Sequence, residues 1–224
     1  MNRRYFLSSL TATALGFGGG ATWARRRRQG CLCGVPDMPQ ASLLFPDKWG
    51  QHHLRWYMGS RDSDLDKSTW DAVFTRAFAS WSRVTRLTFE QVFDYSQAEL
   101  AIGVSGRKRS GFGKRGGVLA WAQLPVGRNF DGRLLSMFDT AELWTDDPAA
   151  TGTLLQSVAA HEIGHLLGLR HSDDKNALMY PYITDAKIPQ GDDVSRIRAL
   201  YGRPRAISPG PVEPRLESPA GSRC

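Results

Sequence analysis

Three histidines and one glutamate, spaced within eleven residues, are the side chains of this sequence best suited to chemistry. His161 and His165 lie four residues apart, so on a helix of about 3.6 residues per turn their imidazoles project from one face and can hold a single metal ion. Glu162 points elsewhere, which suits a carboxylate that polarises a water molecule at the metal without ligating it. Gly168 allows a sharp left-handed turn that brings His171 back as a third ligand. Three histidines leave the fourth position open, so the pattern predicts a catalytic zinc site with Glu162 as the base.

A methionine extends this pattern. Met179 follows eight residues after His171, where a tight turn can lie beneath the metal site. Together with the histidines it resembles the metzincins, and Ser172 narrows the resemblance to the matrixins, the matrix metalloproteinase family. A bare HExxH sequence occurs by chance on many structural helices, but the full eleven-residue pattern is far more specific. The resemblance covers residues 31–202 and implies a zinc endopeptidase.

Periodic apolar residues predict the elements that must position this site. In chain order the sequence predicts a strand at 52–57, a helix at 66–84, strands at 87–92 and 99–104, an edge strand at 117–122, the metal-site helix at 153–167 and a final helix at 192–201. By resemblance the fold class is α+β and metzincin-like. We expect a mixed, twisted sheet of about five strands with two helices, followed by a small lower subdomain that contains the methionine turn and the final helix.

Composition and charge fit a soluble globular protein, with 41% hydrophobic and 23% charged residues. The formal net charge of +7 includes six arginines within the first 28 residues, so the remainder carries only +1. We therefore infer no nucleic-acid partner. The expected partner is a protein or peptide substrate, and the chain is expected to be a monomer.

Residues 1–24 are predicted to be an export signal. They begin with a basic pair, continue through small and apolar residues, and contain too much glycine for a good membrane span. Arg3 and Arg4 followed by Tyr5 resemble a twin-arginine signal, while an ordinary secretory signal or a short membrane anchor is the alternative. The expected location is secreted or extracellular, or periplasmic if the source is bacterial, with no stable membrane span in the mature chain.

Residues 25–42 are expected to be a short pro-segment. The five residues that start at Cys33 resemble the matrixin cysteine switch, in which a thiolate occupies the fourth zinc position and keeps the enzyme latent. Leu32 stands where the family usually has arginine, which puts latency in doubt, and an incidental loop thiol is the alternative. With Cys31 and Cys224 the chain has three cysteines, so it is not a disulfide scaffold. The catalytic domain is expected at 43–202 and a proline-rich tail at 203–224.

The resemblance also assigns substrate-binding positions. Ala120 lies in the predicted edge strand over the cleft, to which a peptide adds as a further strand. Pro181 and Tyr182 correspond to the wall of the primary specificity pocket. Ile183 stands where the family more often has tyrosine, so side-chain preference cannot be carried over. Asp193 is expected to hold the amino terminus that activation releases.

The metal sites beyond the first are expected to differ from the family pattern. The ligands of a second, structural zinc are all missing, so one zinc per chain is predicted, with packing of Trp121 and Met137 in place of the second ion. Asp139 and Glu142 match family calcium ligands. Solvated loop carboxylates are the alternative for this pair.

The sequence is therefore interpreted as a secreted zinc-dependent endopeptidase. A non-catalytic, zinc-bearing matrixin-like binding protein is the alternative. Retention of Glu162 and all three histidines favours the enzyme, because a pseudoenzyme usually loses one of these first. A third interpretation, a processed peptide-hormone or matrix-anchor module, is not supported by the short tail.

Overall fold

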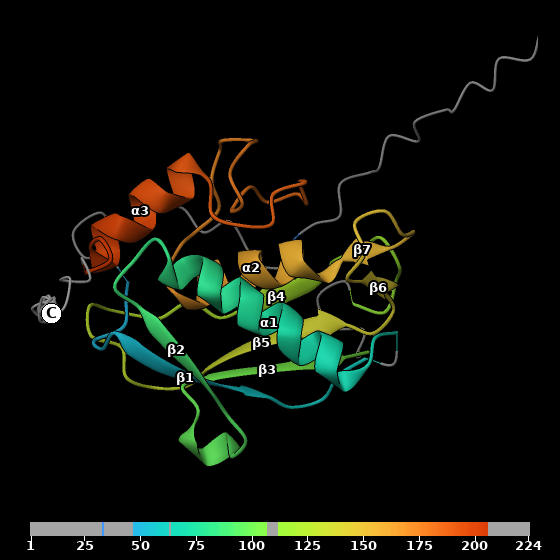
Figure 1. The fold of residues 1–224 in the computed structure, drawn as a ribbon, viewed down its shortest axis with the longest axis horizontal. Coiled ribbons are helices and arrows are strands. Elements are labelled where there is room, and N and C mark those ends of the chain that lie inside the picture. Colours follow the sequence, from blue (N-terminus) through green and yellow to red (C-terminus); the bar gives the residue numbers. More distant parts are fainter. Residues whose placement is uncertain (1–32, 34–46, 63, 107–111, 206–224) are drawn as a thin grey trace, which may run out of the picture.

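A computed structural model describes residues 33, 47–62, 64–106 and 112–205 (Figure 1). The predicted export signal, most of the pro-segment, the basic loop around residue 110 and most of the tail lie outside the described residues. No helix in the described ranges is long and apolar enough to cross a membrane.

A five-stranded mixed sheet forms the base of the fold, in the order β2-β1-β3-β5-β4. Its strands are β1 (His53–Met58), β2 (Thr88–Val92), β3 (Leu100–Ser105), β4 (Ala120–Ala122) and β5 (Leu134–Asp139). All neighbours pair in parallel except β4, which runs antiparallel to β5. A second, two-stranded sheet joins β6 (Trp144–Thr145) to β7 (Thr153–Leu154). The predicted α+β class and the five-stranded sheet are confirmed.

Two helices, α1 (Lys67–Ser82) and α2 (Leu155–Leu166), pack on each other and against the sheet (Figure 1). The Asp66 carboxylate caps α1 by accepting the N–H of Thr69 at 2.7 Å. The final helix α3 (Gly191–Tyr201) ends at Gly202, whose φ of 77° is the left-handed conformation that glycine adopts readily. A short 3-10 turn, η1 (Tyr95–Gln97), lies between β2 and β3.

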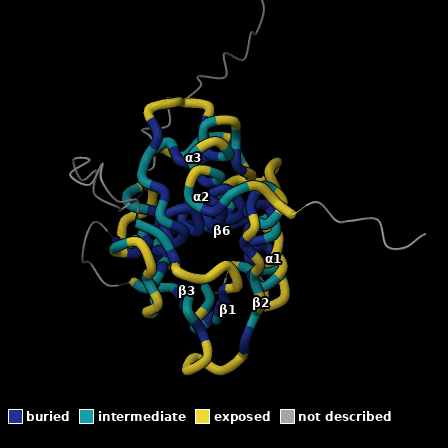
Figure 2. Tube along the Cα trace, turned by 90° about the vertical axis from the view of Figure 1, so that its left-hand side faces the viewer, coloured by how far each residue is buried: buried dark blue, intermediate teal, exposed yellow. Residues whose placement is uncertain are grey.

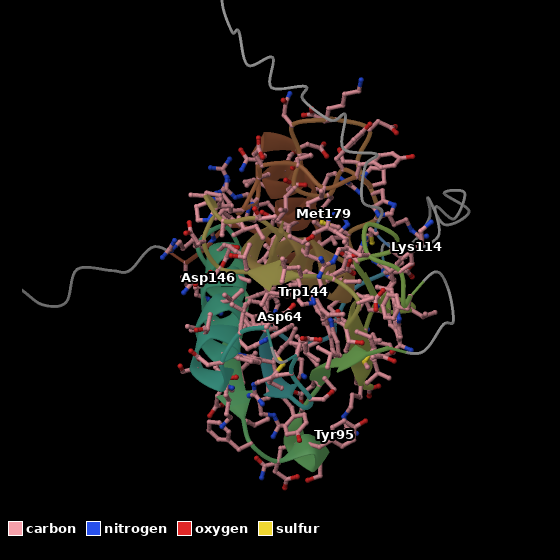
Figure 3. The ribbon with its side chains drawn as sticks, turned by 90° about the vertical axis from the view of Figure 1, so that its right-hand side faces the viewer. Asp64, Tyr95, Lys114, Trp144, Asp146 and Met179 are labelled. Atoms are coloured by element: carbon pink, nitrogen blue, oxygen red, sulfur yellow. The ribbon has the colours of Figure 1, made fainter. Side chains whose placement is uncertain are left out.

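Aromatic side chains of α1 form the centre of the core. Phe78 stacks on Trp56 of β1 with ring centroids 5.0 Å apart, and Phe74 meets Phe138 of β5 edge-to-face at 5.3 Å. Trp144 is fully buried beside them, and its backbone N–H is held by the Asp64 carboxylate (Figure 3). Buried residues run through the middle of the molecule, whereas exposed residues gather in the connecting turns (Figure 2). The helix predicted at 66–84 therefore places its aromatic side chains in the core.

The structure differs from the sequence-based expectation at three places. Strand β5 was not anticipated, because its sequence lacks an apolar–polar alternation. Ser136 takes a buried position, whereas Leu135 and Met137 take partly exposed ones. The metal-site helix begins at Leu155, since Thr153 and Leu154 pair with β6 instead. The expected edge strand is confirmed but is shorter, at Ala120–Ala122.

Candidate metal centre

Helix α2 holds three of the four predicted chemical side chains in the interior. His161 is 8% exposed, Glu162 is 1% exposed and His165 is fully buried. Every residue of this helix is buried, so its position is set by packing on all sides. The imidazoles of His161 and His165 are therefore placed by a rigid element and not by a surface loop.

The turn after α2 has the geometry predicted for Gly168. Its φ is 99°, and a Cβ at this position would lie 2.4 Å from the carbonyl oxygen of Asp47. Only glycine fits such a close approach in that conformation. The Leu169 N–H then donates to Gly164 O at 2.9 Å and closes the helix, so the chain turns back toward the metal-site face.

Two residues distant in the sequence hold the end of α2. The indole N–H of Trp49 donates to the carbonyl of Leu166 at 2.8 Å, and the hydroxyl of Tyr201 donates to that of Leu167 at 2.8 Å. These bonds satisfy carbonyls that a helix end otherwise leaves without partners. Sequence reasoning missed this role, because the bonds join residues more than 30 positions apart.

The predicted ligands converge. One nitrogen from each of His161, His165 and His171, together with the sulfur of Cys33, lies within 4.8 Å of the others. The Nε2 atoms of His161 and His165 are 3.1 Å apart, and Cys33 Sγ is 3.4 Å from His165 Nε2. Tetrahedral zinc with bonds of about 2.05 Å to nitrogen and 2.3 Å to sulfur separates its ligand atoms by about 3.3 to 3.6 Å. The donor set and its spacing fit zinc.

Carbonyl oxygens orient two of these rings. Nδ1 of His161 lies 2.7 Å from Leu178 O, and Nδ1 of His165 lies 2.7 Å from Leu169 O. A carbonyl only accepts, so each Nδ1 carries the hydrogen and each Nε2 presents its lone pair to the cluster. Burial lowers the pKa of His161 to about 4 and also lowers that of His165, so both rings are neutral at pH 7 and suited to bind a metal.

Glu162 adjoins the cluster without belonging to it. Its Oε1 accepts the S–H of Cys33 at 3.2 Å, whereas its buried Oε2 has no hydrogen-bond partner among the described residues. Burial raises the pKa of Glu162 to about 8, and a dication at the histidines would act in the opposite direction. A carboxylate with one unsatisfied buried oxygen beside a cation site is suited to accept a proton there.

Met179 forms the floor beneath these ligands. It is fully buried, and a Cβ added to Gly164 would lie 2.3 Å from its sulfur. The Asp193 carboxylate accepts the backbone N–H groups of Leu178 and Met179 at 2.7 and 3.0 Å, and that of Gln190 at 2.7 Å. The predicted turn beneath the site therefore depends on an anion from α3.

The role expected for Asp193 is wrong. Its carboxylate is fully buried and already accepts three N–H bonds, so a released amino terminus has no access to it. Its neighbour Asp192 is also engaged, since it accepts the hydroxyl of Ser172 at 2.6 Å. Ser172, noted in the sequence for its position after the third histidine, thus ties that segment to α3.

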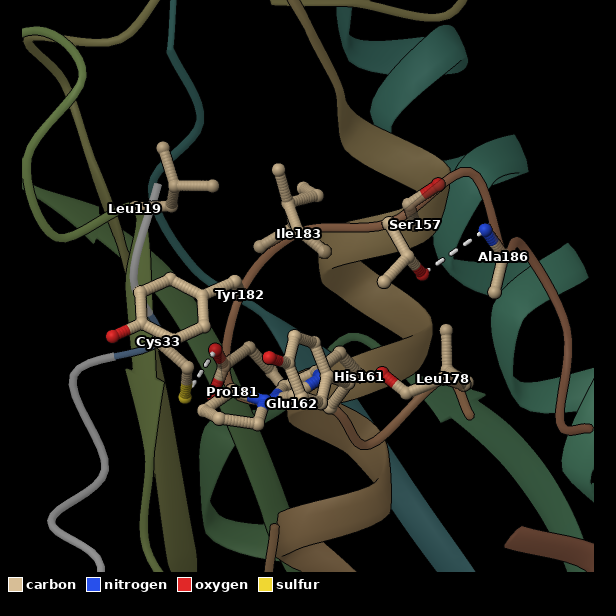
Figure 4. Close-up of a pocket in the computed structure, with 13 residues that line it drawn as sticks. Cys33, Leu119, Ser157, His161, Glu162, Leu178, Pro181, Tyr182, Ile183 and Ala186 are labelled. Atoms are coloured by element: carbon tan, nitrogen blue, oxygen red, sulfur yellow. Dashed lines mark hydrogen bonds between the residues drawn. The ribbon is translucent and has the colours of Figure 1, made fainter. Parts of the chain in front are cut away.

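A pocket opens beside the cluster (Figure 4). It holds about 320 Å³ of empty space, part of it open to solvent, and both Pro181 and Tyr182 line it. The backbone N–H of Cys33 donates to the carbonyl of Pro181 at 3.1 Å. Cys33 therefore joins this wall by the kind of main-chain bond that an extended peptide makes.

Comparison with known proteins agrees with this geometry. The family model described as Matrixin matches residues 48–202. The chain belongs to the matrixin family.

Several curated matrixins are similar over most of this chain. Stromelysin-1 of Rattus norvegicus is 39% identical over 183 residues, which are 77% of this chain and 37% of the relative. Karilysin of Tannerella forsythia is 39% identical over 172 residues, 74% of this chain and 36% of the relative. Matrix metalloproteinase-18 of Xenopus laevis is 38% identical over 200 residues, 86% of this chain and 40% of the relative. The chain thus spans well under half the length of these relatives.

The matrixin edge strand is where the sequence placed it. In the part of the chain that the structure describes, β4 lies at the end of the sheet and pairs only with β5, and Ala120 within it is fully buried. Trp121 stands directly opposite Met137 in this pairing, as expected of two residues that pack together. Among the described residues, the Cys33–histidine group is the one cluster of three or more metal-binding side chains.

Asp139 and Glu142 are buried and not solvated. Asp139 accepts the N–H of Gly113 at 2.7 Å and Glu142 accepts that of Gly116 at 2.5 Å. Burial and the neighbouring Asp139 raise the pKa of Glu142. The two carboxylates therefore fasten the loop before β4, and calcium at this pair stays a prediction.

Proposed function

We propose that this matrixin is a secreted zinc-dependent endopeptidase that cleaves extracellular proteins or peptides. The observation that carries the proposal is the convergence of three imidazoles, those of His161, His165 and His171, beside a buried carboxylate with an unsatisfied oxygen. His161, His165 and His171 would hold one zinc ion. Zinc bound there supplies Lewis acidity to the scissile carbonyl and to a water molecule.

The protein's own groups perform the remaining work. Glu162 accepts a proton from the attacking water and passes it to the nitrogen of the leaving amine. The free edge of β4 near Ala120 and the carbonyl of Pro181 bind the substrate backbone as an extended strand. Side chains next to the scissile bond enter the pocket lined by Tyr182.

Cys33 is proposed to keep the chain latent. Its sulfur contacts His165 and donates a hydrogen bond to one oxygen of Glu162. The thiol therefore occupies the space that water and substrate require. Because the thiol is covalently tethered, its local concentration is high, on the order of millimolar for short flexible linkers. Release requires a thiol reagent or a cut after the switch motif. Export by residues 1–24 belongs to this proposal, as does calcium at Asp139 and Glu142.

Cleavage of a broad fluorogenic peptide set, with and without a zinc chelator, tests the function. The Cys33→Ser chain should cleave peptides, lose activity with the chelator and contain one zinc. Glu162→Ala in that background should keep fold and zinc but lose at least a hundredfold in rate. Glu90→Ala, at an exposed glutamate on β2, is the matched control and should stay active.

Two outcomes would refute parts of the proposal. Activity of the Glu162→Ala chain within tenfold of its parent would exclude Glu162 as the base. A chain that binds zinc tightly but cleaves none of the peptides would be the non-catalytic binding protein.

A further inference from the structure

The pocket beside the metal centre is lined mainly by apolar groups, among them Leu119, Val158, Leu178 and Ile183. Such a pocket by itself selects only for size and apolar surface. Polar side chains also line the pocket, and Ser157 is one of them. Ser157, on α2, is 4% exposed and lies in the pocket wall (Figure 4).

The hydroxyl of Ser157 has no hydrogen-bond partner among the described residues, although it is buried. A buried serine on a helix usually bonds back to a carbonyl of the preceding turn. Ser80 on α1 does so, donating to Ala77 O at 2.7 Å. Leaving a hydroxyl buried and unpaired is unfavourable, so the position of Ser157 suggests a partner that arrives with the ligand.

Ser157 is placed to meet the end of a side chain and not the peptide backbone. It precedes His161 by four residues, so the two share a helix face one turn, or about 6 Å, apart. A peptide whose backbone passes His161 can reach Ser157 only with a long, extended side chain. Glutamine and methionine both have that length, and only glutamine ends in a hydrogen-bonding group.

Charged side chains of similar length suit the pocket poorly. Glu162 is the one carboxylate in the described lining, and lysine and arginine are absent from it. A substrate carboxylate would be buried without a counter-ion and would lie near Glu162. A buried ammonium at the Ser157 end would find no carboxylate in the described lining except that of Glu162. A neutral amide avoids both penalties.

We propose that Ser157 makes this pocket select a neutral side chain with a hydrogen-bonding end, glutamine in particular, next to the scissile bond. The inference rests on the proposed endopeptidase function and adds its substrate preference. Ser157 forms one hydrogen bond with the amide, and that bond is lost with methionine, which has nearly the same length and volume.

The test compares kcat/KM for peptides that carry glutamine or methionine at either position flanking the cleaved bond. In the zinc-loaded Cys33→Ser chain, the ratio of kcat/KM for the glutamine peptide to that for the methionine peptide should fall about three- to tenfold on Ser157→Ala. A factor of this size corresponds to the loss of one neutral hydrogen bond. Ser157→Thr should retain most of the ratio, since it keeps the hydroxyl. Ser80→Ala removes a buried helix hydroxyl outside the pocket and should leave the ratio unchanged.

The outcomes separate this inference from the proposed function. If the Cys33→Ser chain cleaves peptides and Ser157→Ala leaves the ratio within twofold, the role of Ser157 is refuted and the endopeptidase stands. If no peptide is cleaved, the endopeptidase itself is refuted, and the preference assigned to Ser157 with it.

Discussion

Replacing Gly164 by alanine should destabilise the metal centre from within its own helix. The added Cβ would lie 2.3 Å from Met179 Sδ and 3.0 Å from Trp81 Cζ2. Ordinary contact is at about 3.8 Å, so the sulfur must move by about 1.5 Å within a core that is already full. Trp81 cannot yield freely, because its indole N–H donates to Ala160 O at 2.9 Å.

The expected cost follows from three effects. Overpacking costs about 1–3 kcal/mol. Weakening the Trp81 hydrogen bond costs about 1 kcal/mol, and the greater helix propensity of alanine returns about the same amount. The net loss should be about 1–3 kcal/mol in the free energy of unfolding. Gly164 lies between His161 and His165, so zinc affinity should fall as well.

Urea unfolding measures the loss, in excess chelator so that metal binding does not contribute to the apparent stability. Gly191→Ala is the matched control, because a Cβ there would meet nothing within 4 Å. It should be neutral or slightly stabilising. Repeating Gly164→Ala in a Met179→Ala background removes the main clash, so most of the loss should disappear. An equal loss in both backgrounds would refute the contact with Met179 as its cause.

Four further predictions concern other parts of the site. Asp193→Ala leaves three N–H groups, two of them buried, without an acceptor and should cost about 3 kcal/mol or more in urea unfolding. Because the folded chain raises the pKa of Glu142, the stability from its protonated form is complete below about pH 4.5 and is lost as pH rises through the folded value. The Glu142→Gln chain should therefore gain stability relative to wild type between pH 4 and pH 7. Calcium binding at Asp139 and Glu142 is tested separately, since it should raise the wild-type Tm in millimolar calcium. The uncut Cys33→Ser chain should be active without thiol reagents, and activity equal to that of the uncut wild type would exclude latency through the thiol. Trp49→Phe removes the indole bond at the end of α2 and should lower zinc affinity severalfold in a competition titration.

The ligands were predictable because their spacing is local. A helix converts the four-residue interval between His161 and His165 into a shared face, and Gly168 marks the turn that returns the chain. Cys33 could be placed only by resemblance, since it precedes His161 by 128 positions and nothing in its own segment indicates which groups it contacts.

Residues whose function depends on distant partners could not be assigned. Asp193 was given the wrong partner, because sequence shows an acidic residue near a helix start but not the three N–H groups around it. Trp49 is assigned no role by its local sequence, although its indole N–H holds the end of α2. Ser157 drew no attention, since an unpaired hydroxyl is visible only when all of its neighbours are known.

The contact of Cys33 with both His165 and Glu162 has a kinetic consequence. In the proposed latent form, the one thiol covers the fourth zinc position and the neighbouring carboxylate together, so one displacement uncovers both. This geometry therefore offers no intermediate in which the metal is accessible while the thiol still contacts Glu162. The rise of peptidase activity during activation should therefore follow a single exponential. Each molecule should be either inactive or fully active, and the rate should be that at which the Cys33 sulfur leaves.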